Sequence, residues 1–167
     1  MSVGATAAWP GLDEPGLNRL AARLAPVVRD GGVVYLRGDL GAGKTTFARA
    51  LLGALGVGTR VKSPTYSLIE SYNAGPLAIH HLDLYRIADA GELEWLGLAD
   101  LTSEPFLALV EWPERGEGAL PVPDLTIRLA HAQAGRDVVM EATGERGADW
   151  LRQLAEIEAG RNGLPAA

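Results

Sequence analysis

The chain has 167 residues, of which 47% are hydrophobic, and this length and composition suit one domain with a sizeable core. It contains no cysteine, which excludes disulfides, thiolate metal sites and cysteine nucleophiles. The formal net charge of −6 excludes the basic surface from which nucleic-acid-binding proteins draw their counterion-release energy. Because no apolar run approaches membrane-spanning length and the first ten residues lack a basic flank before an apolar stretch, we expect a cytoplasmic protein with no membrane association.

Hydrophobic spacing predicts alternating helices and strands in the first third of the chain. Leucine and alanine recur at helical spacing over residues 15–25, and Pro26 ends or kinks this helix. A short apolar strand follows over residues 33–37, and a second helix spans residues 44–55. This order of strand, glycine-rich loop and helix is typical of a P-loop fold.

The remaining two thirds of the chain predict two hairpins and two further helices. Asn-Ala-Gly-Pro at 73–76 is a strong turn signal between two strand-like runs, and Gln-Ala-Gly at 133–135 separates another pair. The expected strands cover residues 66–72, 77–86, 106–112, 124–132 and 136–143, and the expected helices cover residues 91–101 and 148–158. We therefore predict an α/β, three-layer fold with a mixed parallel and antiparallel sheet, in one domain over residues 1–160 with a flexible tail over 161–167.

The sequence Gly-Asp-Leu-Gly-Ala-Gly-Lys-Thr at 38–45 is a complete phosphate-binding P-loop. Its glycines allow backbone N–H groups to point at phosphates, and the N-terminus of the following helix adds partial positive charge. We expect Lys44 to reach the β- and γ-phosphates from the solvent side, and the Thr45 hydroxyl to bind Mg²⁺. The alternative is a merely glycine-rich turn, but the strand before the loop and the helix after it favour a nucleotide site. The predicted nucleotide-binding residues are Gly38, Asp39, Leu40, Gly41, Ala42, Gly43, Lys44, Thr45 and Thr46.

A P-loop site also needs a carboxylate to complete its magnesium site. The continuous apolar run over residues 107–110 is typical of a central strand, and it ends in Glu111. Glu111 is therefore the predicted Mg²⁺ ligand beside Thr45. The alternative interpretation is a strand-end glutamate in a solvated loop.

A second acid is predicted to act on the attacking water. Strand alternation puts His81, Asp83 and Tyr85 on one face of their strand, with leucines on the other face. Asp83 is the natural acceptor of a proton or a water hydrogen. The alternative is an exposed polar face of an antiparallel strand. The neighbouring His80 points away from His81, so the two histidines make a poor metal pair.

The loop Lys-Ser-Pro-Thr-Tyr at 62–66 is the third candidate. Pro64 holds the preceding residue extended and thereby fixes the approach of Thr65. A threonine here could sense the γ-phosphate in the manner of a GTPase switch loop. A plain turn is the alternative.

Five segments together resemble one protein family. They are GDLGAGKTTFARALL (38–52), SPTY (63–66), HLDLYR (81–86), ELEWLGLADL (92–101) and VEWPER (110–115). They are similar to the TsaE (YjeE) family, bacterial P-loop ATPases of tRNA threonylcarbamoyladenosine synthesis. The similarity runs in order from about residue 15 to about residue 143, and the joint occurrence of SPTY, HLDLYR and VEWPER is far more specific than the P-loop.

This resemblance implies an ATPase that supports TsaD-like and TsaB-like partners, which transfer a threonylcarbamoyl group to adenosine 37 of tRNAs reading ANN codons. Lys44 and its loop would bind the phosphates of ATP, Thr45 and Glu111 would bind Mg²⁺, Asp83 would assist hydrolysis, and Thr65 would lie in a switch-like loop. Relatives often have a threonine near the adenine in the first helix turn, where this chain reads Glu-Pro-Gly-Leu at 14–17. The acidic net charge implies that tRNA is reached only indirectly, through the partner proteins.

Two other functions remain open at this stage. A P-loop small-molecule kinase also places an acid after the P-loop helix, but such kinases need an arginine-bearing lid, and no long loop here clusters arginines. A nucleotide-dependent binding switch is the second alternative. The missing lid also predicts slow hydrolysis without partner proteins, and we expect the chain alone to be a monomer.

Overall fold

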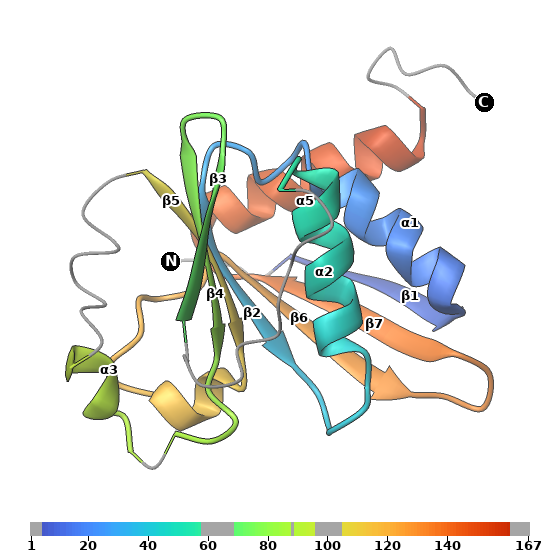
Figure 1. Ribbon diagram of the computed structural model, residues 1–167. Coiled ribbons are helices and arrows are strands. Elements are labelled where there is room, and N and C mark those ends of the chain that lie inside the picture. The colour runs from blue at the N-terminus through green and yellow to red at the C-terminus, as the bar shows by residue number, and fades with distance from the viewer. Residues whose placement is uncertain (1–4, 58–68, 88, 96–104, 161–167) are drawn as a thin grey trace.

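A seven-stranded mixed sheet lies at the centre of the computed structural model, which describes residues 5–57, 69–87, 89–95 and 105–160. The strand order is β1-β7-β6-β2-β5-β4-β3 (Figure 1). The strands are β1 (Thr6–Leu12), β2 (Gly32–Arg37), β3 (Ile69–Ala74), β4 (Leu77–Asp83), β5 (Phe106–Glu111), β6 (Leu125–His131) and β7 (Arg136–Ala142). The helices are α1 (Glu14–Leu24), α2 (Lys44–Ala54), α3 (Glu92–Trp95), the 3-10 helix η1 (Pro113–Gly116) and α5 (Gly144–Glu158).

Four neighbouring strands at the centre of the sheet are parallel. β2 pairs in parallel with both β5 and β6, and β5 pairs in parallel with β4. The hairpins β3–β4 and β6–β7 and the pair β1–β7 are antiparallel. The predicted α/β fold with a mixed sheet is therefore confirmed. Because β2, β4 and β5 run in the same direction, their carboxyl ends meet at one edge, where open α/β sheets bind their ligands.

Helices cover the two faces of the sheet unequally. α1, α2 and α5 pack on one face, where Leu20, Leu36 and Phe47 are fully buried (Figure 1). On the other face, Leu93 of α3 packs in a smaller core with Leu82 and with other residues of the β2–β5–β4 half. The central half of the sheet is thus a three-layer structure, whose larger core supports the elements that lead to and from the P-loop.

Local sequence explains where α1 begins. The carboxylate of Asp13 accepts a hydrogen bond of 2.8 Å from the backbone N–H of Gly16, and Pro15 lies in the first turn. The helix starts one residue before the predicted position. α5 begins at residue 144 and not at 148, because its first turn carries none of the apolar periodicity on which the prediction rested.

The structure adds one strand that the sequence did not predict and shortens another. β1 forms an edge of the sheet and is irregular between Trp9 and Leu12, where it contains Pro10 and Gly11. β4 ends at Asp83, whereas the predicted strand extended to residue 86.

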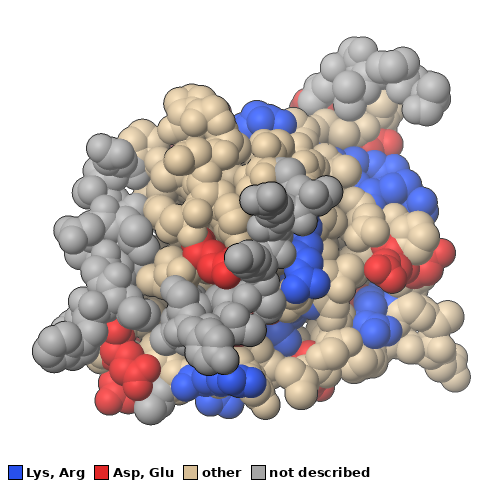
Figure 2. Space-filling model, in the orientation of Figure 1, with Lys and Arg blue, Asp and Glu red and all other residues tan. Residues whose placement is uncertain are grey.

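Parts of several predicted features lie outside the described residues. They are the loop with Thr65, the start of the strand predicted over 66–72, the end of the helix predicted over 91–101, and the tail over 161–167. On the face shown in Figure 2, the acidic and basic side chains of the described residues are interspersed and form no continuous basic surface. None of the helices in the described ranges has the length and apolar character needed to cross a bilayer.

Candidate functional site

The P-loop connects the carboxyl end of β2 with the N-terminus of α2. Gly43 caps α2 in the left-handed conformation, with a φ of 107°, which a glycine adopts without steric cost. No side chain caps this helix, so its N-terminus is open to an anion. This geometry could accommodate a phosphate group.

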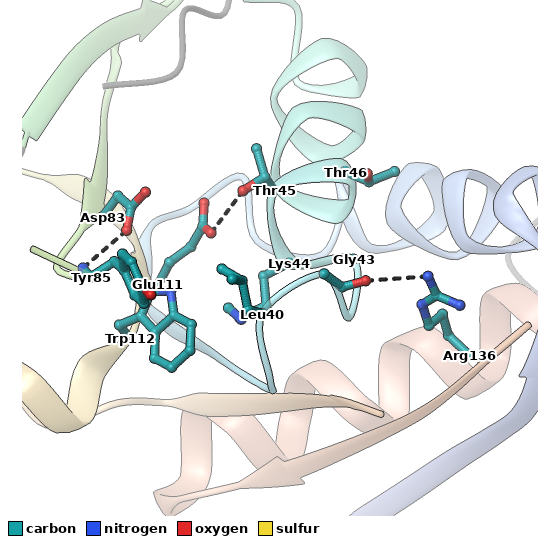
Figure 3. A pocket seen from close by; sticks show the side chains of 11 residues that line it. Leu40, Gly43, Lys44, Thr45, Thr46, Asp83, Tyr85, Glu111, Trp112 and Arg136 are labelled. Atoms are coloured by element: carbon teal, nitrogen blue, oxygen red, sulfur yellow. Dashed lines mark hydrogen bonds between the residues drawn. The ribbon is translucent and has the colours of Figure 1, made fainter. Parts of the chain in front are cut away.

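A cavity of about 270 Å³ lies between the P-loop and the carboxyl ends of β4 and β5. In Figure 3 the acids Asp83 and Glu111 lie on one side of Lys44, and Arg136 lies on the other. The cavity is lined by Leu40, Gly41, Gly43, Lys44, Thr45, Thr46, Asp83, Tyr85, Glu111, Trp112 and Arg136. The edge of the sheet thus brings together residues from four separate parts of the chain.

Lys44 is buried, which corrects the expectation that it lies on the solvent side. Its side chain is 5% exposed, and its ammonium group donates hydrogen bonds to the carbonyl oxygens of Gly38 (2.5 Å) and Asp39 (3.0 Å). The ammonium also lies 4.0 Å from the centre of the Trp112 ring, a favourable cation–π distance. Burial lowers the pKa of Lys44, and the nearby carboxylate of Glu111 partly opposes this effect. A phosphate group in the cavity would oppose the effect of burial in the same way as the Glu111 carboxylate does.

Both oxygens of the Glu111 carboxylate are held by neighbouring side chains. The hydroxyl of Thr45 donates to Oε1 at 2.9 Å, and Nε2 of His81 lies 2.6 Å from Oε2. Glu111 is 2% exposed and His81 is 1% exposed. Thr45 and Glu111, the two predicted metal ligands, are therefore in direct contact, and His81 packs behind them instead of facing the solvent.

Asp83 lies beside Glu111 because the two residues are register partners in the parallel pair β4–β5. Its Oδ1 accepts a hydrogen bond of 3.1 Å from the backbone N–H of Tyr85, and its side chain lines the cavity. Burial raises the pKa of Asp83; the Tyr85 hydrogen bond lowers it and Glu111 raises it further. The carboxyl group can thus hold a proton more readily than an exposed aspartate.

An aromatic pair forms one wall of the cavity. Trp112 is in the left-handed conformation, with a φ of 58°, and among the described residues it is the only non-glycine residue with a positive φ. Such a conformation is unusual for a bulky side chain and marks backbone strain next to the site. The Tyr85 ring lies 4.9 Å from the Trp112 ring, between centroids. Tyr85 follows the end of β4, so it lines the cavity from a turn and not from the strand face that the alternation predicted.

The oxygen donors at this edge fit Mg²⁺. No group of three or more histidine, cysteine or acidic side chains in the described ranges could hold a metal ion by itself. Mg²⁺ in phosphate sites is usually bound by one or two carboxylates together with substrate phosphates and water, so it needs no such group. Glu111 places a carboxylate in contact with the Thr45 hydroxyl, and both groups are hard oxygen donors. The residues therefore suit a magnesium ion that arrives with a phosphate ligand.

A second cavity of about 150 Å³ adjoins the first. The two share Gly43, Thr46 and Arg136, and the second one is also lined by Leu12, Asp13, Glu14, Leu17 and Gly135. It thus lies against the start of α1, where the resemblance puts the adenine. Gly135 and Arg136 belong to the turn and first residue of the β6–β7 hairpin and were not among the predicted site residues. No motif signals them, because their place in the site depends on the pairing of β7 with β1.

Some of the predicted nucleotide-binding residues line the larger cavity and the others do not. Leu40, Gly41, Gly43, Lys44, Thr45 and Thr46 line the larger cavity. Gly38 and Asp39 do not; their carbonyl oxygens hold the Lys44 ammonium. Ala42, within the loop, is fully buried. Thr65 lies outside the described residues.

Comparisons with known proteins identify a family and a related fold. The family model described as "Threonylcarbamoyl adenosine biosynthesis protein TsaE" matches residues 13–138. The tRNA threonylcarbamoyladenosine biosynthesis protein TsaE of Haemophilus influenzae is 44% identical over 110 residues, which cover 66% of this chain and 70% of the relative. The Bacillus subtilis protein of the same name is 37% identical over 139 residues, 83% of this chain and 87% of the relative. The crystal structure of Bacillus subtilis YdiB superposes with a TM-score of 0.77 at 28% identity and covers 95% of this chain and 99% of that one.

Proposed function

Because this chain belongs to the TsaE family, we propose that it binds and hydrolyses Mg²⁺-ATP in support of tRNA threonylcarbamoyladenosine formation. The observation that carries this proposal is the 2.9 Å contact between Thr45 and Glu111 at the foot of the P-loop cavity. A hydroxyl from the P-loop helix and a carboxylate from the neighbouring strand are the protein ligands that a phosphate-bound Mg²⁺ takes in P-loop enzymes. When bound, Mg²⁺ supplies charge neutralisation at the β- and γ-phosphates.

Lys44 and the α2 N-terminus hold the phosphate chain in this proposal. The backbone N–H groups at the uncapped N-terminus of α2 can donate hydrogen bonds to an anion, and the Lys44 ammonium can exchange its carbonyl partners for phosphate oxygens. Trp112 keeps water from one side of the ammonium, which strengthens its attraction to phosphate.

Asp83 acts on the attacking water. Its raised pKa makes the carboxylate a better proton acceptor than an exposed aspartate, and it lines the same cavity as Thr45 and Glu111. The water oxygen attacks the γ-phosphorus, the bond from this phosphorus to the β–γ bridging oxygen breaks, and ADP and inorganic phosphate form. Asp83 orients the water and receives its proton.

The adjoining smaller cavity would take the base of the nucleotide. It lies between the start of α1 and the β6–β7 hairpin, and its apolar wall comes from Leu12 and Leu17. Because it shares Gly43 and Thr46 with the phosphate cavity, one ligand can occupy both.

The partners in this proposal are TsaD-like and TsaB-like proteins, and tRNA is reached only through them. The net charge of −6 leaves too few cations to neutralise tRNA phosphates at physiological salt. Titration of the purified chain with tRNA should therefore show no tight binding, whereas addition of the two partners should raise phosphate release. Tight tRNA binding by the chain alone, or a rate that is indifferent to the partners, would contradict this part of the proposal.

The hydrolysis itself is tested with ATP labelled at the γ-phosphate. The wild-type protein with Mg²⁺ should release free phosphate, and Thr45→Val should lose the Mg²⁺-dependent part of this activity. Thr6→Val makes the same change at an exposed position of the edge strand β1, so this control should behave as wild type. Transfer of label to a metabolite would instead support a kinase, and nucleotide binding without turnover would support a binding switch.

A further inference from the structure

Arg136 is the one basic side chain besides Lys44 among the described residues that line the two cavities. It is the first residue of β7, and its guanidinium group reaches the P-loop from the opposite side to the acids (Figure 3). Nε donates to the carbonyl oxygen of Ala42 at 3.1 Å, and Nη2 donates to that of Gly41 at 3.2 Å. A single side chain thus holds two consecutive peptide groups in the P-loop.

The backbone of Arg136 is itself fixed on both sides. Arg136 pairs with His131 across the β6–β7 hairpin and with Leu12 of β1. The preceding Gly135 has a φ of 77°, and a Cβ atom there would lie 2.2 Å from the carbonyl oxygen of Leu12. Asp137 accepts a hydrogen bond of 2.8 Å from the backbone N–H of Gly11. The hairpin tip is therefore locked against the β1–α1 connection, and Arg136 extends from a rigid base.

These contacts act on the orientation of the P-loop peptides. The N–H of Ala42 already donates to the carbonyl oxygen of Asp39 at 3.0 Å, so of the two peptides that Arg136 binds, the Ala42–Gly43 peptide is the one that can serve a phosphate. Its C=O and N–H point in opposite directions, so the bond from Arg136 to the Ala42 carbonyl turns the N–H of Gly43 away from Arg136, and Gly43 lines the cavity. The planar guanidinium fork of arginine suits two adjacent acceptors, which the ammonium of lysine cannot bind with the same geometry. With a third hydrogen bond to the Gly135 carbonyl (3.1 Å), Arg136 uses three of its five donors.

We propose that Arg136 is a positioning residue of the phosphate site, which holds the Ala42–Gly43 peptide of the P-loop so that the N–H of Gly43 faces the bound phosphates. The inference rests on the proposed nucleotide site and adds to it a residue that acts through the loop. Arg136 lies on the opposite side of Lys44 from Glu111 (Figure 3), so it should contribute to phosphate affinity without altering the dependence on Mg²⁺.

The test compares ligands with and without phosphates, in the absence of Mg²⁺. ADP affinity is measured by isothermal titration calorimetry, and adenosine binding is measured by ligand-observed NMR titration. Arg136→Gln should weaken ADP binding by about tenfold or more, as expected for loss of charge-assisted hydrogen bonds. It should weaken adenosine binding much less, because Arg136 also lines the smaller cavity but its hydrogen bonds hold the loop at the phosphates. Arg128→Gln is the matched control, since Arg128 lies on the same hairpin, where it is exposed and pairs with Glu141. It should bind both ligands as wild type does.

Arg136→Lys separates positioning from charge. It keeps the cation but loses the fork, so its ADP affinity should stay close to that of Arg136→Gln. Full recovery in Arg136→Lys, or an equal loss of ADP and adenosine in either variant, would overturn the inference. Circular dichroism and thermal unfolding show whether Arg136→Gln folds. If it does not, the same comparison of ADP with adenosine is made between Arg136→Lys and wild type. A wild-type chain that does not bind ADP would overturn the proposed function, whereas normal ADP binding by the variants overturns this inference alone.

Discussion

His81 Nε2 lies 2.6 Å from Oε2 of Glu111, and both side chains are almost completely buried. The contact fixes one carboxylate oxygen while Thr45 binds the other, so Glu111 cannot rotate without breaking a buried hydrogen bond. Nδ1 of His81 is the only buried side-chain nitrogen or oxygen in the described ranges that has no hydrogen-bond partner. The only side-chain hydrogen bond of His81 is thus the one to Glu111, and His81 thereby supports the predicted metal ligand.

His81→Leu should destabilise the protein and weaken its response to Mg²⁺. Removal of the ring leaves a buried carboxylate oxygen without a partner, at a cost of about 1–3 kcal/mol in the free energy of unfolding. Loss of such a support typically lowers metal affinity by about 10- to 100-fold. Urea unfolding and Mg²⁺ titration of the ADP complex measure the two effects. His80→Leu, which alters the neighbouring histidine bound to Ser71, should leave the Mg²⁺ titration unchanged.

Lys44→Met should lower ADP and ATP affinity by roughly 10- to 100-fold, since a charge-assisted contact to phosphate is lost. The fold should survive, because the methionine stem keeps the packing against Trp112 and no buried cation needs to be desolvated. Calorimetric titration measures the nucleotide affinity, and thermal unfolding shows whether the fold is kept. Undiminished nucleotide affinity in a folded Lys44→Met protein would remove the P-loop assignment.

Glu111→Gln and Asp83→Asn should separate the roles of the two acids. Glu111→Gln should remove most of the difference in ATP affinity between buffers with and without Mg²⁺. Asp83→Asn should keep that difference and slow hydrolysis by about a hundredfold or more, the usual contribution of a general base. ATP affinity and single-turnover phosphate release are measured for both variants, and the reverse pattern would exchange the assignments.

The raised pKa of Asp83 predicts a pH-dependent cost in stability. Burial lifts this pKa above its ordinary value of 3.8, so the folded protein holds the proton more tightly than the unfolded chain. The charged carboxylate is therefore disfavoured in the fold, and the stability contributed by Asp83 falls as the pH rises from the unfolded to the folded pKa. Asp83→Asn should be stabilised relative to wild type, more at pH 7 than at pH 4, in urea unfolding without nucleotide or Mg²⁺. Asp30→Asn, at an exposed acid, should show no such trend.

The P-loop and the two acids could be predicted from the sequence because each lies at the end of an apolar strand, and parallel strands bring their ends to one edge. Asp83 and Glu111 came from separate motifs, yet the β4–β5 register alone puts them side by side. Tyr85 shows the limit of the alternation argument. Tyr85 was expected on the same strand face as Asp83. However, β4 ends at Asp83, and side chains alternate between two faces only within a strand.

The remaining parts of the site depend on contacts between distant segments. Arg136 binds the carbonyl oxygen of Ala42, which lies 94 residues earlier in the sequence, and no local pattern indicates that contact. β1 was missed because Pro10 and Gly11 interrupt it, although its partly buried positions at Ala7 and Trp9 alternate as in a strand. The burial of Lys44 was missed because the motif specifies the loop but not the Trp112 ring that covers its ammonium.

The pairing of Asp83 with Glu111 also determines where this chain can change in length. One residue inserted within β4 would turn His81 and Asp83 to the opposite face and break the contact with Glu111, since side chains alternate with a period of two. Residues inserted between the end of β4 and the start of β5 would leave both strands and the spacing of the acids as they are. Homologues of this chain should therefore differ in the length of that connection and keep the lengths of β4 and β5.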